Sequence, residues 1–328
     1  MGTKSGLRSI ATKLASVTTV ALVLALTACA PTTKYEETAA FLQSKFSAAG
    51  VEGFTAGTPD YGFTLEAITQ LAGSGQLNPV KDVATSILTD ASVTGDSTSK
   101  SGFLFDASTG TFKSGLAGKF LFASKVSGID NEALRQDING LLVEQISADG
   151  AIAGSGDNTF DYGWVVLGLV AQGQGSVAAA VATKLTSFIR EDGGFGFDTS
   201  ANTTASSADA VGMVLMAIAA TKDAGSAESQ TKRTATKDAL IKWLETATVS
   251  GNHFEAWGDV DVNSTAYAAM GLQASGVDSS AYSAWLTTQL VDDGGLETPW
   301  SEGKGDTFAT IQGLLALDGR SYPSLIGK

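Results

Sequence analysis

The chain has one cysteine, Cys29, and one histidine, His253, among its 328 residues. A single cysteine excludes an intramolecular disulfide and a metal site built from several thiolates. One loop histidine is also a poor basis for a Ser–His–Asp triad or a Cys–His pair. The sequence therefore predicts no metal site and no nucleophilic catalytic constellation.

Positive charge is scarce. The chain carries 21 Lys and Arg against 34 Asp and Glu, a formal net charge of -13. Such an acidic protein repels phosphate backbones, so nucleic acid is not expected as a partner. With 43% hydrophobic and 8% aromatic residues, the composition is that of a folded protein and not of a disordered acidic chain.

The few basic residues include Lys4, Arg8 and Lys13, which precede the apolar run 21–26. A charged head and a short hydrophobic body are typical of a secretory signal, and the run is too short for a permanent span. It ends in Leu-Thr-Ala-Cys29, which resembles a bacterial lipobox. In signals of that kind the cysteine sulfur receives a diacylglyceryl group, and the chain is cut just before it.

This resemblance implies a signal peptide over 1–28, a lipidated tether over 29–34 and a folded domain over 35–328. The protein is then expected on the extracytoplasmic face of a bacterial cell membrane, with the lipid bilayer as a partner through Cys29. The tether is short, so the domain should lie close to the bilayer.

The folded part contains an internal repeat. Six segments share a mostly Gly-apolar start, a polar stretch and usually an acidic end, about 40 to 60 residues apart, as helical arrays and toroids do. They are 53–60, 102–111, 150–161, 194–209, 253–263 and 295–306. Apolar, small-residue segments follow them, for example 162–170, 210–218 and 264–272, as expected for helices buried on every side.

Between these segments lie amphipathic stretches such as 131–145 and 238–245. One buried and one amphipathic helix, repeated about six times, is what a closed ring of helical hairpins requires. The sequence therefore predicts an all-α protein, an α/α toroid of about six helical hairpins. The glycines and alanines of the inner helices should allow close helix packing.

The turn Asp192-Gly193-Gly194-Phe195 and its counterpart at 292–296 carry a family resemblance. They resemble the Asp-Gly-Gly-Phe turns of the terpenoid cyclase and protein prenyltransferase toroids, a group that includes the helical domain of cobalamin carriers. In those turns the glycines permit positive backbone angles and the aromatic residue plugs the gap between hairpins. The prenyltransferases bind zinc through Asp, Cys and His, a set that this chain lacks.

Acidic or amide residues stand at the predicted starts of the inner helices. Each is expected to cap its helix by accepting backbone hydrogen bonds, and all should lie at one mouth of the ring, the default place for a ligand. They are Asp60, Asp161, Asp209, Asn263 and Asp306.

The cluster Asp259-Val260-Asp261-Val262-Asn263 resembles the Asp-x-Asp-Asp motif with which triterpene cyclases protonate an alkene. Val262 replaces a partner carboxylate, and those cyclases place the site between two helical domains. Asp261 is thus a weak candidate for a catalytic acid. The cluster also begins like a calcium loop but lacks that loop's glycine and closing glutamate.

The candidate ligand-binding residues lie in the last two mouth loops. Trp257 and Trp300 could bracket a flat or amphipathic ligand beside acidic neighbours, and one imidazole could bind the metal of a bound cofactor. The full set is His253, Glu255, Trp257, Asp259, Asp261 and Trp300.

The leading hypothesis is a binding lipoprotein that captures a medium-sized, partly apolar ligand for a membrane transporter. The cobalamin-carrier resemblance implies a corrinoid as the bound cofactor, and a separate lid protein in place of the carriers' second domain. Enzyme alternatives are a toroid that modifies terpenoids or lipids, or one that cleaves glycans with Glu255 and Asp209 or Asp306 as a carboxylate pair. The fourth hypothesis is a structural interaction module of the cell envelope.

Overall fold

The computed structural model describes residues 33–89, 102–153, 158–199 and 205–326. The predicted signal peptide, Cys29 and most of the tether lie outside these residues. Thr33–Lys328 forms a compact unit by itself, and its first helix begins at Lys34 with Thr33 as the cap. No helix in the described part of the chain is both long and apolar enough to cross a bilayer.

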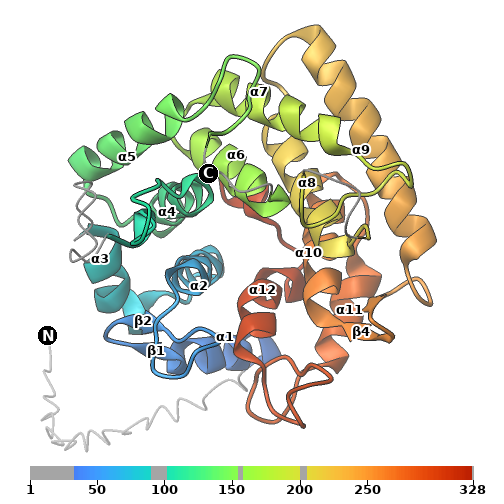
Figure 1. The fold of residues 1–328 in the computed structure, drawn as a ribbon. Helices are drawn as coiled ribbons and strands as arrows, with labels where there is room; N and C mark the ends of the chain where they lie inside the picture. Colours follow the sequence, from blue (N-terminus) through green and yellow to red (C-terminus); the bar gives the residue numbers. More distant parts are fainter. Residues whose placement is uncertain (1–32, 90–101, 154–157, 200–204, 327–328) are drawn as a thin grey trace, which may run out of the picture. The chain divides into compact units, whose positions relative to one another are not determined.

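Helical hairpins form a ring, with one helix of each hairpin inside and one outside (Figure 1). The inner helices are α2 (Tyr61–Gly73), α4 (Ser114–Ser127), α6 (Thr159–Ala171), α8 (Ala208–Ala220), α10 (Val262–Ala274) and α12 (Thr307–Leu317). The outer helices are α1 (Lys34–Ser44), α3 (Lys81–Thr89), α5 (Glu132–Glu144), α7 (Gly175–Leu185), α9 (Ala227–Ala247) and α11 (Ser280–Thr288).

Each inner helix packs against the next, and α12 packs against α2, so the inner ring is closed. This confirms the predicted all-α toroid. The inner segments proposed from the sequence correspond to α6, α8 and α10, which are buried over nearly their whole length. The amphipathic segments proposed from the sequence correspond to α5 and α9, which carry charged residues beside a few buried ones.

Glycines set the closest helix contacts of the ring. A Cβ atom on Gly118 of α4 would lie 2.4 Å from the Trp164 carbonyl oxygen of α6, and one on Gly168 would lie 2.4 Å from the Gly118 oxygen. Gly212 of α8 and Gly271 of α10 approach each other in the same way. The small residues of the inner helices therefore allow backbone-to-backbone contact, as expected.

The two Asp-Gly-Gly turns have matching geometry. Gly193 and Gly294 adopt positive φ angles of 83° and 87°. The preceding aspartates accept backbone hydrogen bonds of 2.9 Å from Gly194 and Gly295. The next residue along, Phe195 or Leu296, is fully buried between hairpins. These turns are structural, as the resemblance implied.

Two short antiparallel hairpins interrupt the helices. Strands β1 (Phe46–Ser47) and β2 (Gly50–Val51) form the first, and β3 (Phe254–Ala256) and β4 (Asp259–Asp261) the second. In the second, Ala256 pairs with Asp259, so Trp257 and Gly258 form a two-residue turn. This hairpin falls in a segment that the sequence suggested was a loop, and it projects Trp257 from the mouth.

Short 3-10 segments complete the chain: η1 (Asn78–Val80), η2 (Gly102–Leu104), η3 (Thr186–Phe188) and η4 (Tyr322–Leu325). The last of them follows α12 and contacts α8 and α10. Its Tyr322 side chain is fully buried and reaches the centre of the ring, where it contacts the rings of Trp164 and Phe122.

Candidate functional site

The amino ends of the inner helices surround one mouth of the ring. Asp60 and Asp306 cap α2 and α12 by accepting hydrogen bonds of 2.9 Å and 2.7 Å from backbone amides. The capping prediction is therefore confirmed at these two positions. Negative side chains are stabilised there by the helix dipole as well as by the hydrogen bonds.

The capping prediction is wrong at Asp161, Asp209 and Asn263. The residues at the cap positions are Asn158, Ser207 and Asp261, two or three places earlier. Each helix starts before the residue that the sequence suggested. Asp161, Asp209 and Asn263 consequently lie in the first helical turn, where their side chains line the central cavity.

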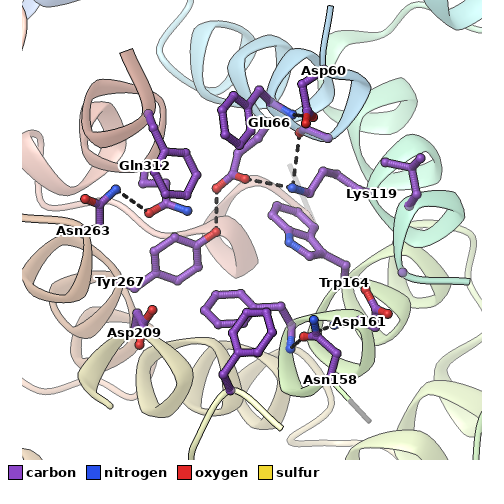
Figure 2. Close-up of a pocket in the computed structure, with 17 residues that line it drawn as sticks. Asp60, Glu66, Lys119, Asn158, Asp161, Trp164, Asp209, Asn263, Tyr267 and Gln312 are labelled. Atoms are coloured by element: carbon purple, nitrogen blue, oxygen red, sulfur yellow. Dashed lines mark hydrogen bonds and ion pairs between the residues drawn. The ribbon is translucent and has the colours of Figure 1, made fainter. Parts of the chain in front are cut away.

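The central cavity, called here the inner chamber, has a volume of about 420 Å³. It is lined by polar groups and aromatic rings from all six inner helices (Figure 2). The polar lining residues are Asp60, Glu66, Lys119, Asn158, Asp161, Asp209, Asn263, Tyr267 and Gln312. The aromatic lining residues, besides Tyr267, are Phe63, Phe160, Trp164, Phe197 and Phe308.

Glu66 organises the floor of the inner chamber. It is only 2% exposed, and its Oε1 accepts hydrogen bonds from the hydroxyls of Tyr267 (2.5 Å) and Tyr322 (2.8 Å). Its Oε2 accepts a 2.8 Å hydrogen bond from Lys119 Nζ. Burial and the nearby Glu66 charge raise the pKa of both tyrosines well above the ordinary value, so both hydroxyls stay protonated as donors.

The two acids of the helix first turns have a different environment. Burial raises the pKa of Asp161 to about 6, and the Lys119 charge offsets part of that effect. Burial also raises the pKa of Asp209, and the neighbouring Asp261 charge adds to the increase. Desolvation disfavours the charged form of a carboxyl group, so both acids can hold a proton near neutral pH more readily than a surface aspartate can.

A second cavity of about 660 Å³, called here the outer cavity, adjoins the inner chamber. Phe197 and Asp209 line both of them. The outer cavity is bounded by the β3–β4 hairpin, by Trp243 of α9 and by the segment before α8. A ligand of medium size could therefore extend from the hairpin into the ring.

The outer cavity brings together three of the residues predicted from the sequence: Glu255, Trp257 and Asp261. Asp259 lies on the same hairpin but lines neither cavity. Asp261 caps α10, with Oδ1 accepting from the Ser264 amide and Oδ2 from the Ser264 hydroxyl, both at 2.9 Å. Both carboxylate oxygens of Asp261 are therefore engaged within the helix cap.

The remaining predicted residues lie outside the cavities. His253 stacks on Trp285, with ring centroids 4.9 Å apart and an interplanar angle of 8°, and its Nε2 lies 3.9 Å from Glu255. Trp300 is 72% exposed in the loop before α12. Of the carboxylates considered as a glycan-cleaving pair, Glu255 and Asp209 share the outer cavity and Asp306 does not. Within the described residues, no cluster of three metal-binding side chains occurs.

The polar floor was not predicted from the sequence. Glu66 and Lys119 are charged residues within otherwise apolar inner helices, and such an interruption was a usable signal. Nor was the exposure of the rim aromatics Phe54 and Phe197 predicted. Phe54 rests on Phe63 and Phe308, with centroid distances of 5.1 Å and 5.5 Å. The mouth thus displays aromatic rings on several of its loops.

No protein-family model matches this chain, and no curated protein sequence does. Solved structures with the same fold do match. The type II terpene cyclase MstE from Scytonema superposes with a TM-score of 0.60 at 15% identity, covering 87% of this chain and 96% of that chain. Haptocorrin in complex with Cbi superposes with a TM-score of 0.54 at 13% identity, covering 90% of this chain and 68% of the haptocorrin chain. A glycosidase superposes with a TM-score of 0.56 at 15% identity, covering 90% of this chain and 98% of the glycosidase chain.

These similarities establish the α/α-toroid fold and no more, because all identities are far below the level at which function follows. Nearly the whole of the MstE chain matches this one ring. The chain is similar in fold to a terpene cyclase, to a corrinoid carrier and to glycosidases.

Proposed function

We propose that this protein is an extracytoplasmic binding lipoprotein, held to a bacterial membrane through Cys29. It captures a medium-sized, partly apolar ligand at the mouth of the toroid and passes it to a membrane transporter. The observation that carries this proposal is Trp257, which is 94% exposed at the tip of the β3–β4 turn and walls the outer cavity.

The backbone at Trp257 supports a binding role. Its φ angle is 53°, in the left-handed region that bulky residues avoid, and Gly258 follows at 90°. The left-handed backbone at a bulky residue lowers the stability of the free protein, and the exposed indole offers apolar surface that a ligand could cover. Such a residue is expected where a ligand or partner covers it.

A corrinoid is the specific ligand that we propose. The adjoining cavities offer room for a large, flat molecule, and Trp257 provides an aromatic face for one side of it. The fold similarity to haptocorrin in complex with Cbi adds support. A separate lid protein would cover the mouth, because all the described residues after the tether belong to the ring.

Isothermal titration calorimetry of residues 33–328 with cobinamide, cobalamin and haem tests this proposal. We expect saturable binding of a corrinoid, weakened at least about tenfold by Trp257→Ala, as for an aromatic anchor in an interface. Trp285→Phe is the matched control, because Trp285 lines neither cavity, and it should leave the affinity unchanged. No saturable heat with either corrinoid at 100 µM would exclude a corrinoid carrier, because a binding free energy of about −6 kcal/mol already corresponds to a Kd of about 40 µM.

One observation favours a second candidate, an acid-catalysing toroid enzyme that acts on a terpenoid. Asp161 has a raised pKa, and no hydrogen bond to its side-chain oxygens is found among the described residues. It lines an aromatic chamber together with Trp164. Asp161 is therefore suited to protonate a substrate in this chamber. Mass spectrometry of mixtures with squalene and geranylgeranyl substrates would reveal cyclised products, which Asp161→Asn should abolish.

A further inference from the structure

The inner chamber is walled by aromatic rings that lie on opposite sides of it. Phe63 of α2 stacks on Phe308 of α12, with centroids 4.6 Å apart and an interplanar angle of 20°. On the other side, Phe160 meets Tyr267 edge-on, with centroids 5.4 Å apart. Trp164 is also directed inward (Figure 2), and its ring already has the Lys119 ammonium 4.7 Å from its centroid, so Phe63, Phe308, Phe160 and Tyr267 are the rings left for a ligand. Aromatic faces carry negative electrostatic potential, so such walls favour a cation.

The chamber also contains carboxyl groups that have no cationic partner in the part of the chain that the structure describes. Lys119 is the only basic residue among those that line it, and its ammonium is already bound to Glu66 (2.8 Å) and to the Gly62 carbonyl oxygen (3.2 Å). One carboxylate therefore neutralises the one cation. Asp161 and Asp209 line the same space, and neither forms an ion pair within the described residues.

Gln312 adds an independent indication that a ligand enters the chamber. Its side chain is only 7% exposed, and its Oε1 accepts a 2.7 Å hydrogen bond from Asn263 Nδ2. Its Nε2 donates to no group in the described part of the chain, and the side chain is directed toward the chamber (Figure 2). An amide donor that opens onto the chamber can form a hydrogen bond with an oxygen acceptor on a bound molecule.

We infer that the inner chamber binds an organic cation, namely an amine or quaternary ammonium group that carries a neighbouring oxygen atom. The aromatic walls contact the cation, Asp161 and Asp209 neutralise it, and Gln312 donates to the oxygen. This inference rests on the proposed function, since it takes the mouth as a ligand site, and it names the group that enters deepest. The same charges repel phosphate and carboxylate groups from this position.

The chemical contrast between choline and 3,3-dimethylbutan-1-ol tests the inference directly. The two molecules have almost the same shape and hydroxyl group, and only choline is charged. By calorimetry with residues 33–328, we expect saturable choline binding and at least about tenfold weaker binding of the neutral alcohol, the contrast that cation–π and charge contacts produce. Equal affinity for the two, or no choline binding, overturns the inference.

Variants locate the site. Asp209→Asn and Asp161→Asn should each weaken choline binding by about tenfold, as loss of a charge partner does, while leaving the affinity for the neutral alcohol unchanged. Asp149→Asn, on the exposed surface, is the matched control and should have no effect. Thermal unfolding of each variant shows that it is folded. Unchanged choline binding in both chamber variants would also overturn the inference.

Two further measurements distinguish failure of the cation site from failure of the proposed carrier, and a lipid headgroup from a soluble cation. Trp257→Ala should leave choline binding intact, because Trp257 does not line the inner chamber. Corrinoid binding without choline binding would therefore reject the cation site and retain the carrier. Choline-competed co-sedimentation with phosphatidylcholine vesicles would identify a lipid headgroup as the source of the cation, whereas binding of free choline alone would identify a soluble one. Either result supports the inferred chemistry.

Discussion

The hydroxyl of Tyr322 donates a 2.8 Å hydrogen bond to Oε1 of Glu66. This bond links the last 3-10 segment of the chain to the first inner helix, α2, and the same oxygen accepts from Tyr267 of α10. Gln70, one turn further along α2, donates to the Tyr322 hydroxyl at 2.9 Å. The C-terminal segment therefore supplies part of the chamber floor, and the shared Glu66 oxygen links it to α2 and α10.

Replacing Tyr322 with Phe should destabilise the protein without emptying the space that its ring fills. The buried Glu66 oxygen loses one of its two tyrosine donors, and Gln70 loses an acceptor, so we expect a loss of about 1–3 kcal/mol in the free energy of unfolding. Urea denaturation of residues 33–328 measures this loss. Tyr282→Phe is the control, because the Tyr282 hydroxyl has no hydrogen-bond partner within the described residues. Equal effects of the two substitutions would contradict a structural role for the Glu66 bond.

Asp161 should make stability depend on pH in a defined direction. Its pKa is about 6 in the folded protein and near 3.8 when unfolded. An acid whose folded pKa is raised favours folding while it is protonated. This stabilisation is complete below pH 3.8 and is lost as the pH rises toward and beyond 6. Asp161→Asn should therefore be more stable than the wild type at pH 8, by about 1–3 kcal/mol.

The difference between the two proteins should shrink below pH 6 and vanish near pH 4. Urea denaturation of both at several pH values measures it, and taking the difference removes the contributions of the other titrating groups. A difference that grew as the pH fell would mean that Asp161 is stabilised in its charged form. That result would contradict both the proposal that Asp161 is a catalytic acid and the finding that Asp161 forms no ion pair in the described part of the chamber.

Much of the ring could be predicted because its inner helices are apolar on every side and their turns repeat. The residues that line the inner chamber could not be predicted in the same way, as Asp161, Asp209 and Glu66 show. Asp161 and Asp209 appeared to be caps because each precedes an apolar run, but Asn158 and Ser207 begin the helices earlier. Helix starts decide which side chains face the cavity, and sequence patterns locate them only within a few residues.

Glu66 shows the second reason. A charged residue in a buried helix signals a functional or structural partner, but the partner cannot be identified from spacing. Its donors come from positions 53, 201 and 256 residues away along the chain. Only the closed ring brings them together. The plug of the turn was easier to predict, since Phe195 follows an Asp-Gly-Gly turn that recurs at 293–295 and is buried as expected.

The glycine contact between α4 and α6 gives a prediction with an internal control. A Cβ atom on Gly118 would meet the backbone of Trp164, which cannot rotate away, so Gly118→Ala should destabilise the protein by about 1–3 kcal/mol. Gly140 lies exposed in α5 with open space around its Cα atom, and Gly140→Ala should instead stabilise the protein by up to about 1 kcal/mol through helix propensity. Thermal unfolding of the two variants should therefore shift in opposite directions. A parallel shift would contradict the tight helix contact.

Trp257 allows stability and binding to be separated in one substitution. Its left-handed backbone is strained for a bulky residue and is tolerated by asparagine, so Trp257→Asn should keep or raise the free energy of unfolding, by up to about 1 kcal/mol. The same change removes the aromatic wall of the outer cavity, so affinity for the ligand should fall about tenfold or more.

The contrasting substitution is Trp285→Asn. Trp285 is partly buried against His253, so its loss should lower stability and leave ligand affinity almost unchanged. Urea denaturation gives the free energy of unfolding of each variant, and calorimetry gives its affinity for the ligand. A protein that retains an exposed, strained tryptophan at the cost of its own stability is expected to use that residue for binding. If Trp257→Asn instead lowered stability and left affinity intact, the hairpin tip would be a structural element, and the binding site would have to lie in the inner chamber alone.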